Sequence, residues 1–221
     1  TKAAEMVAIV ARVKEWEADF NMLNASAERL IRDAKHFELD PPELPGFEEL
    51  RDDLGGYTSA GALFDEYLAE LAKIGAEDWI TFRSRVWAFE DFVDAWIQRV
   101  DEAPAGAIVR HMRGELDAFK ELAPLLKLVR GDGFQPDHWA ALFRQLGVRG
   151  VTVDKLTLSH FVAAAPNLLA NADAVRELVA RAAGEVAIRD AVNEVTVWAA
   201  EARFSLTEYA SGGRVTPVIK D

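Results

Sequence analysis

The chain has 221 residues, half of them apolar and none of them cysteine, which allows a sizeable core and excludes disulfides, thiol catalysis and thiolate metal sites. Its net charge of −12 arises in residues 1–105, where 23 acids face 11 bases, and this field disfavours nucleic acid and anionic membranes as partners. Because no apolar run of about eighteen residues and no signal-peptide pattern is present, we expect a cytoplasmic protein that neither spans a membrane nor is secreted.

The first predicted element is a long helix from Met6 to Phe37. Its apolar residues alternate in steps of three and four, which is the heptad pattern of coiled-coil helices that pack along one seam. They are Val13, Trp16, Phe20, Leu23, Ala27, Leu30, Ala34 and Phe37. The proline-rich segment 40–45 ends this helix, because proline cannot continue a helix and restrains the residue before it.

A second helix is predicted from Phe47 to Leu71, because the same spacing continues through Gly55-Gly56 without a break. The seam comprises Phe47, Leu50, Leu54, Tyr57, Gly61, Phe64, Leu68 and Leu71. We expect the paired glycines to weaken this helix, since each costs about 1 kcal/mol relative to Ala. Gly61 lies on the seam itself, where it either admits a large aromatic side chain from a neighbouring helix or is simply tolerated.

A third helix is predicted after the reversal at Gly75-Ala76-Glu77-Asp78, with Asp78 as its N-cap. Its apolar stripe comprises Trp79, Phe82, Val86, Phe89, Val93, Trp96 and Val100, and Trp87 and Phe92 widen the face. Aromatic residues at this strict spacing indicate a core rather than a stacking or cofactor surface.

A fourth helix is predicted from Val109 to Val129, with Pro124 inside it. We expect Pro124 to kink this helix or to begin a new helical segment. Four long helices joined by short loops favour antiparallel packing of neighbours, and about 30 residues at 1.5 Å each give a rod of roughly 45 Å.

The elements become shorter after Arg130-Gly131-Asp132-Gly133. We predict a helix from Pro136 to Leu146, a turn at Gly147 to Gly150 and a short helix near Thr157 to Ala164. This change predicts two bundles, residues 1–130 and 131–221, which reorient slightly about residues 131–135.

The last long helix changes its apolar face at Gly184, so we expect it to have two different neighbours. One stripe comprises Val175, Val179, Ala182 and Val186, and the next comprises Ile188, Val192, Val195, Ala199 and Ala202. From Phe204 the period falls to two, and Gly212-Gly213 separates two strand-like runs, which predicts a hairpin near residues 203–219. The expected fold is therefore all-α, with elongated antiparallel helical bundles and a short C-terminal β-hairpin.

No catalytic, cofactor-binding or metal-binding residue is predicted. His36, His111, His138 and His160 are far apart and form no ligand-spaced pair. No Gly-Lys-Ser/Thr phosphate loop is present, so the chain cannot bind ATP in that way. The acid pairs Asp52-Asp53 and Asp65-Glu66 lie at polar helical positions, and the tripeptide Arg130-Gly131-Asp132 is not expected to serve cell adhesion in an intracellular chain.

Several runs resemble the linker region of a dynein heavy chain. They are Gly184 to Ala191, Trp198, Phe204 to Tyr209 and Gly212 to Asp221, with similar signatures at Asp137-His138-Trp139, Leu142 and Leu156-Thr157-Leu158. The run Gly-Glu-Val-Ala-Ile-Arg at 184–189, with Asp78 to Arg83 and Leu128 to Gly131, most resembles the cytoplasmic dynein 2 type of retrograde intraflagellar transport. The resemblance covers about residues 77–221. Residues 1–76 match in helical character and are either the end of the tail or the start of the linker.

This resemblance implies a mechanical role. In the family, the linker is a helical rod across a ring of AAA+ ATPase modules, and its N-terminal side joins the dimerising, cargo-binding tail. The segment would transmit force and hydrolyse nothing, while ATP and Mg²⁺ would bind elsewhere in the parent chain. Expected partners are the ring and tail of the same chain, dynein intermediate or light chains and intraflagellar transport proteins, at the cytoskeleton of a cilium or flagellum. A start without Met and an end at Ile219-Lys220-Asp221 favour a fragment.

Two other functions compete with this one. A spectrin-like scaffold would dock a partner on its acidic helical surface, and an exposed apolar patch well beyond about 400 Å² would favour it. An enzyme built on a helical bundle would require inward-facing carboxylates or histidines. A polar outer surface would favour the lever.

Overall fold

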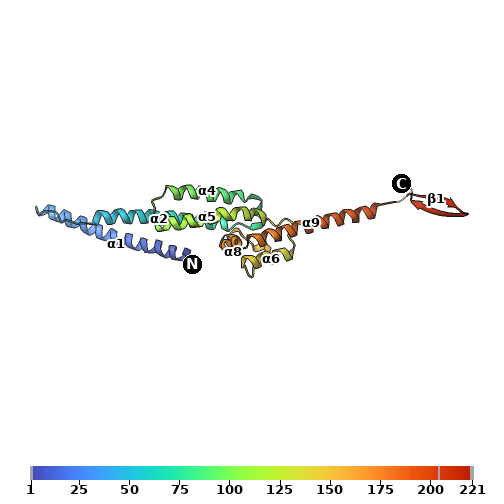
Figure 1. Cartoon of the computed structure of the whole chain (residues 1–221). Coiled ribbons are helices and arrows are strands. Elements are labelled where there is room, and N and C mark those ends of the chain that lie inside the picture. Colours follow the sequence, from blue (N-terminus) through green and yellow to red (C-terminus); the bar gives the residue numbers. More distant parts are fainter. Residues whose placement is uncertain (1, 204, 220–221) are drawn as a thin grey trace.

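The computed structural model describes residues 2–203 and 205–219, and it confirms the predicted all-α class with a terminal hairpin. The helices follow one another along a long axis, with α1 and α2 at one end, α4 to α8 in the middle and α9 leading to the hairpin (Figure 1). The helices are α1 (Lys2–His36), α2 (Phe47–Gly75), α3 (Trp79–Phe82), α4 (Trp87–Glu102), α5 (Ala107–Leu128), α6 (Pro136–Leu146), α7 (Leu158–Ala163), α8 (Ala165–Ala170) and α9 (Ala172–Glu201). Two short 3₁₀ turns are η1 (Arg83–Arg85) and η2 (Val153–Lys155). Among the described residues, every helix falls short of the length or the apolar character that crossing a bilayer requires.

The first two helices form an antiparallel pair, and α2 runs through Gly55-Gly56 as predicted (Figure 1). Of the predicted α1 seam only Val13 and Phe20 are buried, and Val10, which the predicted seam did not include, is buried as well. The alternate seam residues Trp16, Leu23, Leu30 and Phe37 are exposed, because α1 packs mainly on α2. Gly61 does not face an aromatic ring: a Cβ atom there would lie 3.3 Å from Val10 Cγ1, so the glycine permits close approach of α1.

The third predicted helix is interrupted. It consists of α3, the turn η1 and α4, and the Ser84 hydroxyl donates to the Thr81 carbonyl within the interruption. Such local side-chain bonds compete with helical backbone bonds. The predicted stripe is nevertheless buried along its whole length, and Asp78 caps α3 by accepting the Thr81 N–H at 2.8 Å. The expectation that Trp87 widens the buried face is wrong, because its side chain is exposed.

Helix α5 continues through Pro124 to Leu128, so no new segment begins at the proline. The turn at residues 129–135 and helix α6 follow where the sequence predicted them. Helix α8 was not predicted from the sequence, because it contains Pro166. Proline is compatible with a helix at its first turn, and Pro166 occupies that position in α8.

The larger of two hydrophobic cores among the described residues extends across residue 131, and the smaller one lies between α1 and α2. The α2–α3 connection pairs with the η2–α7 connection, since Trp79 N–H donates to the Leu156 carbonyl at 2.8 Å and Leu158 N–H donates to the Glu77 carbonyl at 3.1 Å. The Trp79 ring lies 4.2 Å from that of Phe161, centroid to centroid. Residues 1–130 and 131–221 thus share one interior, while their reorientation about residues 131–135 stays a prediction.

The last helix leaves the body midway. Val175, Leu178 and Ala182 are buried, whereas the second stripe, which begins with Ile188 and Val192, is exposed. The expected second neighbour of α9 is therefore absent among residues 2–203 and 205–219.

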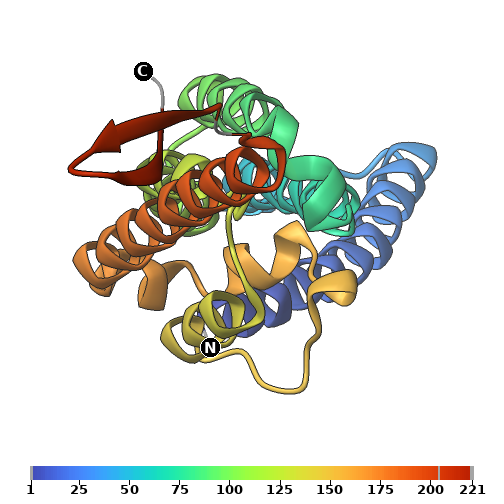
Figure 2. The ribbon, with the colours of Figure 1, turned by 90° about the vertical axis from the view of Figure 1, so that its right-hand side faces the viewer.

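The hairpin consists of β1 (Leu206–Ser211) and β2 (Arg214–Ile219), paired from Leu206↔Ile219 to Ser211↔Arg214. Gly212 and Gly213 both have positive φ, as a two-residue primed turn requires. Phe204, which was expected to begin the first strand, lies outside the described residues. The hairpin is fully exposed and lies nearest the viewer when the molecule is seen from its C-terminal end (Figure 2).

Candidate functional site

Two of the four histidines cap helices. His138 is buried at the start of α6, where its Nδ1 accepts the Gln135 N–H at 3.0 Å and its Nε2 lies 3.2 Å from a Glu185 carboxylate oxygen. His160 plays the same part in α7, since its Nδ1 accepts the Thr157 N–H at 3.1 Å. A side chain at the third helical position that reaches back to the cap is a signal readable from sequence, but here histidine replaces the usual Glu or Gln.

The other candidate residues for chemistry lie apart. His36 is next to the Phe37 ring, and the His111 ring lies 6.1 Å from that of Phe64. Within the described part of the chain, no group of three His, Asp or Glu side chains is arranged to hold a metal ion. Asp65 and Glu66 form ion pairs with Lys14 and Arg99, at 2.6 and 2.5 Å. That the chain has no catalytic, cofactor or metal residue stays a prediction.

Two partly buried hydrogen bonds tie α2 to α5 and to α4. The Tyr67 hydroxyl donates to Glu115 of α5 at 2.8 Å, and the Trp96 indole N–H donates to Glu70 of α2 at 2.8 Å. Burial, aided by the charge of Glu115, raises the pKa of Tyr67 above its ordinary value. The hydroxyl is therefore held as a neutral donor, which suits a structural tie rather than proton transfer.

At the surface, the Arg99 guanidinium also connects α4 to α2. It lies 4.0 Å from the centroid of the Trp96 ring and donates to Glu66, so it covers the indole and crosses from α4 to α2. Its hydrogen bond lowers the pKa of the exposed Glu66 carboxyl. A cation over an aromatic face stabilises by electrostatic attraction to the ring.

The turn at residues 129–135 forms a tight joint between the two predicted segments. Arg83 donates to the Arg130 carbonyl at 2.7 Å and pairs with Asp132 at 3.3 Å, so the Arg-Gly-Asp tripeptide is fixed within the turn. A Cβ atom at Gly131 would lie 2.4 Å from Trp139 Cζ2, and one at Gly133 would lie 2.7 Å from Val186 Cγ2. These contacts bring η1, the turn, α6 and α9 together without room for added atoms.

The joint gathers four of the runs that carried the resemblance. The run 78–83 supplies the cap of α3 and Arg83, the run 128–131 supplies the turn, and 137–139 supplies His138 and Trp139. The run 184–189 supplies Glu185 and Val186, which contact His138 and the turn. Residues far apart in the sequence therefore meet in one place, which periodicity alone could not have shown.

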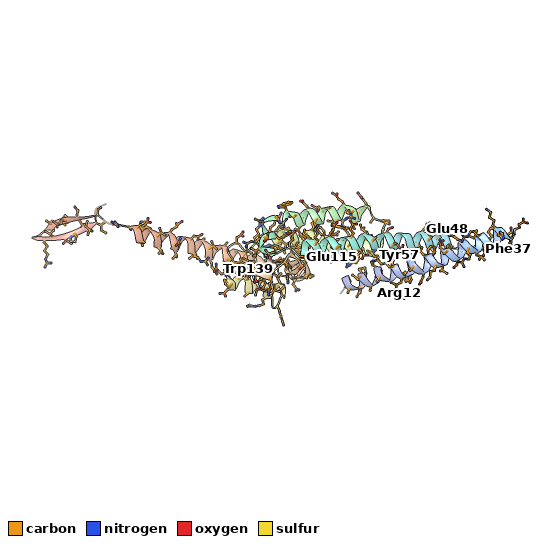
Figure 3. The ribbon with its side chains drawn as sticks, turned by 180° about the vertical axis from the view of Figure 1, so that it is seen from behind. Arg12, Phe37, Glu48, Tyr57, Glu115 and Trp139 are labelled. Carbon is orange, nitrogen blue, oxygen red and sulfur yellow. The ribbon has the colours of Figure 1, made fainter. Side chains whose placement is uncertain are left out.

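Exposed large apolar residues occur mainly on two arms of the molecule, although Ile80, Trp87 and Leu128 are exposed in the middle. On α1 and α2 these include Trp16, Leu23, Leu30, Leu50 and Tyr57. On α9 they are Ile188, Val192, Val195, Val197 and Trp198. Figure 3 shows both arms extending from the crowded centre, with Tyr57 on one arm and Trp139 in the centre.

Comparison with known proteins identifies relatives for this architecture. Residues 47–221 match the family model of dynein heavy chain, N-terminal region 2. Cytoplasmic dynein 2 heavy chain 1 of Caenorhabditis elegans is 33% identical over an alignment of 221 residues that covers 98% of this chain and 5% of that protein. The same protein of Tripneustes gratilla is 37% identical over an alignment of 205 residues that covers 90% of this chain and 5% of that protein. Dynein axonemal heavy chain 10 of Homo sapiens is 21% identical over an alignment of 204 residues that covers 89% of this chain and 4% of that protein.

These matches confirm the predicted family and the similarity to the dynein 2 type. They also extend the likeness beyond residues 77–221, because the family match begins at Phe47, the first residue of α2. The chain spans about one twentieth of the length of these relatives. With four fifths of its residues in the family match, the chain belongs to the dynein heavy chain family.

Proposed function

We propose that this chain is a mechanical linker segment of a dynein heavy chain. It acts as a rigid helical lever that joins the cargo-binding tail to the AAA+ ATPase ring of a microtubule minus-end motor. The observation that carries this proposal is the joint, where the linker-like runs build tight packing between helices instead of a chemical pocket. A segment that transmits force needs such contacts, because a close-packed interior resists deformation.

The arrangement of the helices indicates the path along which force would be transmitted. α1 and α2 extend from one end of the body and α9 from the other, so a load on either arm passes through the shared core (Figure 1). Any reorientation about residues 131–135 would have to break the contacts of Arg83 with Arg130 and Asp132. A small rotation of the two parts about this turn would therefore cost the free energy of these contacts.

The names of the relatives support a more specific role. Several are cytoplasmic dynein 2 heavy chains, so we infer retrograde intraflagellar transport in a cilium or flagellum for the parent motor. Its partners would be the ring and tail of the same chain, intermediate or light chains and intraflagellar transport proteins, in a dimeric parent. ATP and Mg²⁺ would bind in the ring, and this segment would hydrolyse nothing.

A spacer experiment tests the lever in a full-length heavy chain that contains this segment. A flexible Gly-Ser spacer of about ten residues is inserted after Ala187, where α9 has left the body, and the stiff connection becomes a random coil. The matched control carries the same spacer in the Gly147–Gly150 turn, beside the path of the load. We expect the α9 spacer to slow microtubule gliding several-fold while ATP hydrolysis continues, and the control to glide normally. Equal gliding speeds would contradict the proposal.

A docking role is the second candidate, and it is favoured by the exposed apolar stripe on α1. Such a role does not exclude the lever, because the stripe lies on an arm outside the shared core.

A further inference from the structure

An apolar groove runs along one side of the α1–α2 pair, outside the main body. Its floor is formed by Phe20 and Leu54, and it encloses about 390 Å³. Four further apolar side chains line it, Trp16 and Leu23 from α1 and Leu50 and Tyr57 from α2, and each is half exposed. Tyr57 is labelled on this arm in Figure 3.

One side of the groove belongs to an apolar stripe of α2 that is buried further along the helix. Leu50, Tyr57 and Phe64 are spaced by seven residues on α2 and therefore lie on one stripe of the helix. Phe64 is 1% exposed beside His111 of α5, whereas Leu50 and Tyr57 are each 51% exposed. The stripe is buried where α4 and α5 lie over α2 and uncovered where they stop. The α1–α2 pair thus lacks the third helix that the body supplies further along.

The facing apolar stripe on α1 is uncovered as well. Trp16, Leu23, Leu30 and Phe37 are also spaced by seven, and all four are exposed. At 1.5 Å per residue, this stripe extends for about 30 Å, the length of a helix of roughly 20 residues. Two antiparallel helices with adjacent uncovered stripes offer a site for a third helix.

The charges at the groove determine which kind of helix could bind there. Asp19 and Asp53 line it, and no Lys, Arg or His does so among the described residues. Neither carboxylate forms an ion pair with any described residue. Two nearby cations are engaged elsewhere, since Lys14 pairs with Asp65 and Arg51 pairs with Glu48. Arg12 lies 5.9 Å from the centroid of the Trp16 ring, beside one wall of the groove.

We propose that this groove binds an amphipathic helix of a partner protein, with an apolar stripe flanked by Lys or Arg, to complete a three-helix bundle. The apolar stripe covers Trp16, Leu23, Leu50 and Tyr57, and the flanking cations face Asp19 and Asp53. A second copy of this chain fits less well, because a symmetric contact would bring the same carboxylates together. Anionic lipid is disfavoured by the same charges. The proposal does not depend on the lever role.

Two designed peptides test the proposal with the 221-residue chain. Both are fluorescein-labelled helices with the same leucine stripe, flanked by Lys in one and by Glu in the other, and binding is followed by fluorescence anisotropy. We expect the Lys peptide to bind at least about tenfold more tightly. The double variant Asp19→Lys with Asp53→Lys should reverse this preference.

A tryptophan pair provides the matched control. Trp16→Ala removes a wall of the groove and should weaken binding of the Lys peptide about tenfold, as loss of a large aromatic anchor does. Trp87→Ala removes an exposed tryptophan of α4, outside the groove, and should leave binding unchanged. Circular dichroism checks that each variant keeps its helices.

Three results would overturn the proposal. The first is equal binding of the two peptides, or no binding of either. The second is an equal effect of Trp16→Ala and Trp87→Ala. The third is a dimer in sedimentation that Trp16→Ala dissociates, which would assign the groove to a second copy of the chain.

Discussion

Apolar stripes at helical spacing occur both in the body of the molecule, α4 to α8, and in its two arms, the α1–α2 pair and the outer half of α9. The surroundings of these stripes differ. Val93 and Trp96 of α4 are buried, whereas Val192 of α9 and Trp16 of α1 are exposed, although all four lie at helical spacing on apolar stripes. The difference shows that periodicity identifies the face of a helix that can be buried. It does not show whether this chain supplies the element that buries it.

The strongest test of the body is Trp96→Ala. The side chain is almost fully buried, donates to Glu70 and lies beneath Arg99, so its loss leaves a cavity and removes one hydrogen bond between α4 and α2. We expect the free energy of unfolding to fall by about 3–5 kcal/mol in urea denaturation. Trp16→Ala, on the arm, should change it by only about 0.5 kcal/mol. Similar losses would abolish the distinction between body and arm.

Gly131→Ala tests the joint. Gly131 has φ of +73°, and an added Cβ would collide with the Trp139 ring. Gly150→Ala is the control, because Gly150 has φ of +70° but nothing within 4 Å of the added atom. We expect a loss of about 1 kcal/mol at Gly150, from the backbone alone, and about 2–3 kcal/mol at Gly131 by thermal unfolding. Equal losses would mean that Trp139 moves aside freely and the joint is loose.

The pH dependence of stability tests the Tyr67–Glu115 hydrogen bond through Tyr67→Phe. At neutral pH the variant should be about 1 kcal/mol less stable, since Glu115 loses its donor. Because the pKa of Tyr67 is raised in the folded state, its stabilisation is complete below the unfolded pKa and is lost as pH rises. Above pH ~10, the free energy of unfolding of the natural chain should fall by about 1.4 kcal/mol per pH unit relative to the variant. Parallel curves up to pH ~11 would contradict this.

Val192→Ala should have the smallest effect. Val192 is exposed on the outer half of α9, so truncation should change the free energy of unfolding by less than about 0.5 kcal/mol. Val93→Ala removes the same two methyl groups from the body and should cost about 2 kcal/mol. A matching loss at Val192 would show that another element covers α9 in solution.

The sequence predicted the long helices and the hairpin because their signals are local. Heptad spacing, the Asp78 cap and Gly212-Gly213 each act within a few residues, and the structure places them as expected. The interruption at η1 and the helix α8 were missed, since they depend on weak local bonds at Ser84 and on a proline compatible with two positions.

The joint and the groove could not be predicted by the same means. Gly131 meets Trp139, Glu185 meets His138, and Asp78 lies beside Thr157, all through contacts between separate elements. The groove exists because α4 and α5 end partway along α2. The sequence of α2 contains no signal for where they end. The resemblance identified the runs at the joint but not their meeting.

Amide hydrogen exchange, followed by mass spectrometry along the whole chain, tests most directly whether one packed body supports two uncovered arms. Amides in buried helices open only by global unfolding, whereas those in uncovered helices exchange through local opening. We predict the slowest exchange in α4 and α5 and exchange faster by orders of magnitude in residues 188–201 and the hairpin. Uniform protection from α4 to the end of α9 would contradict this account.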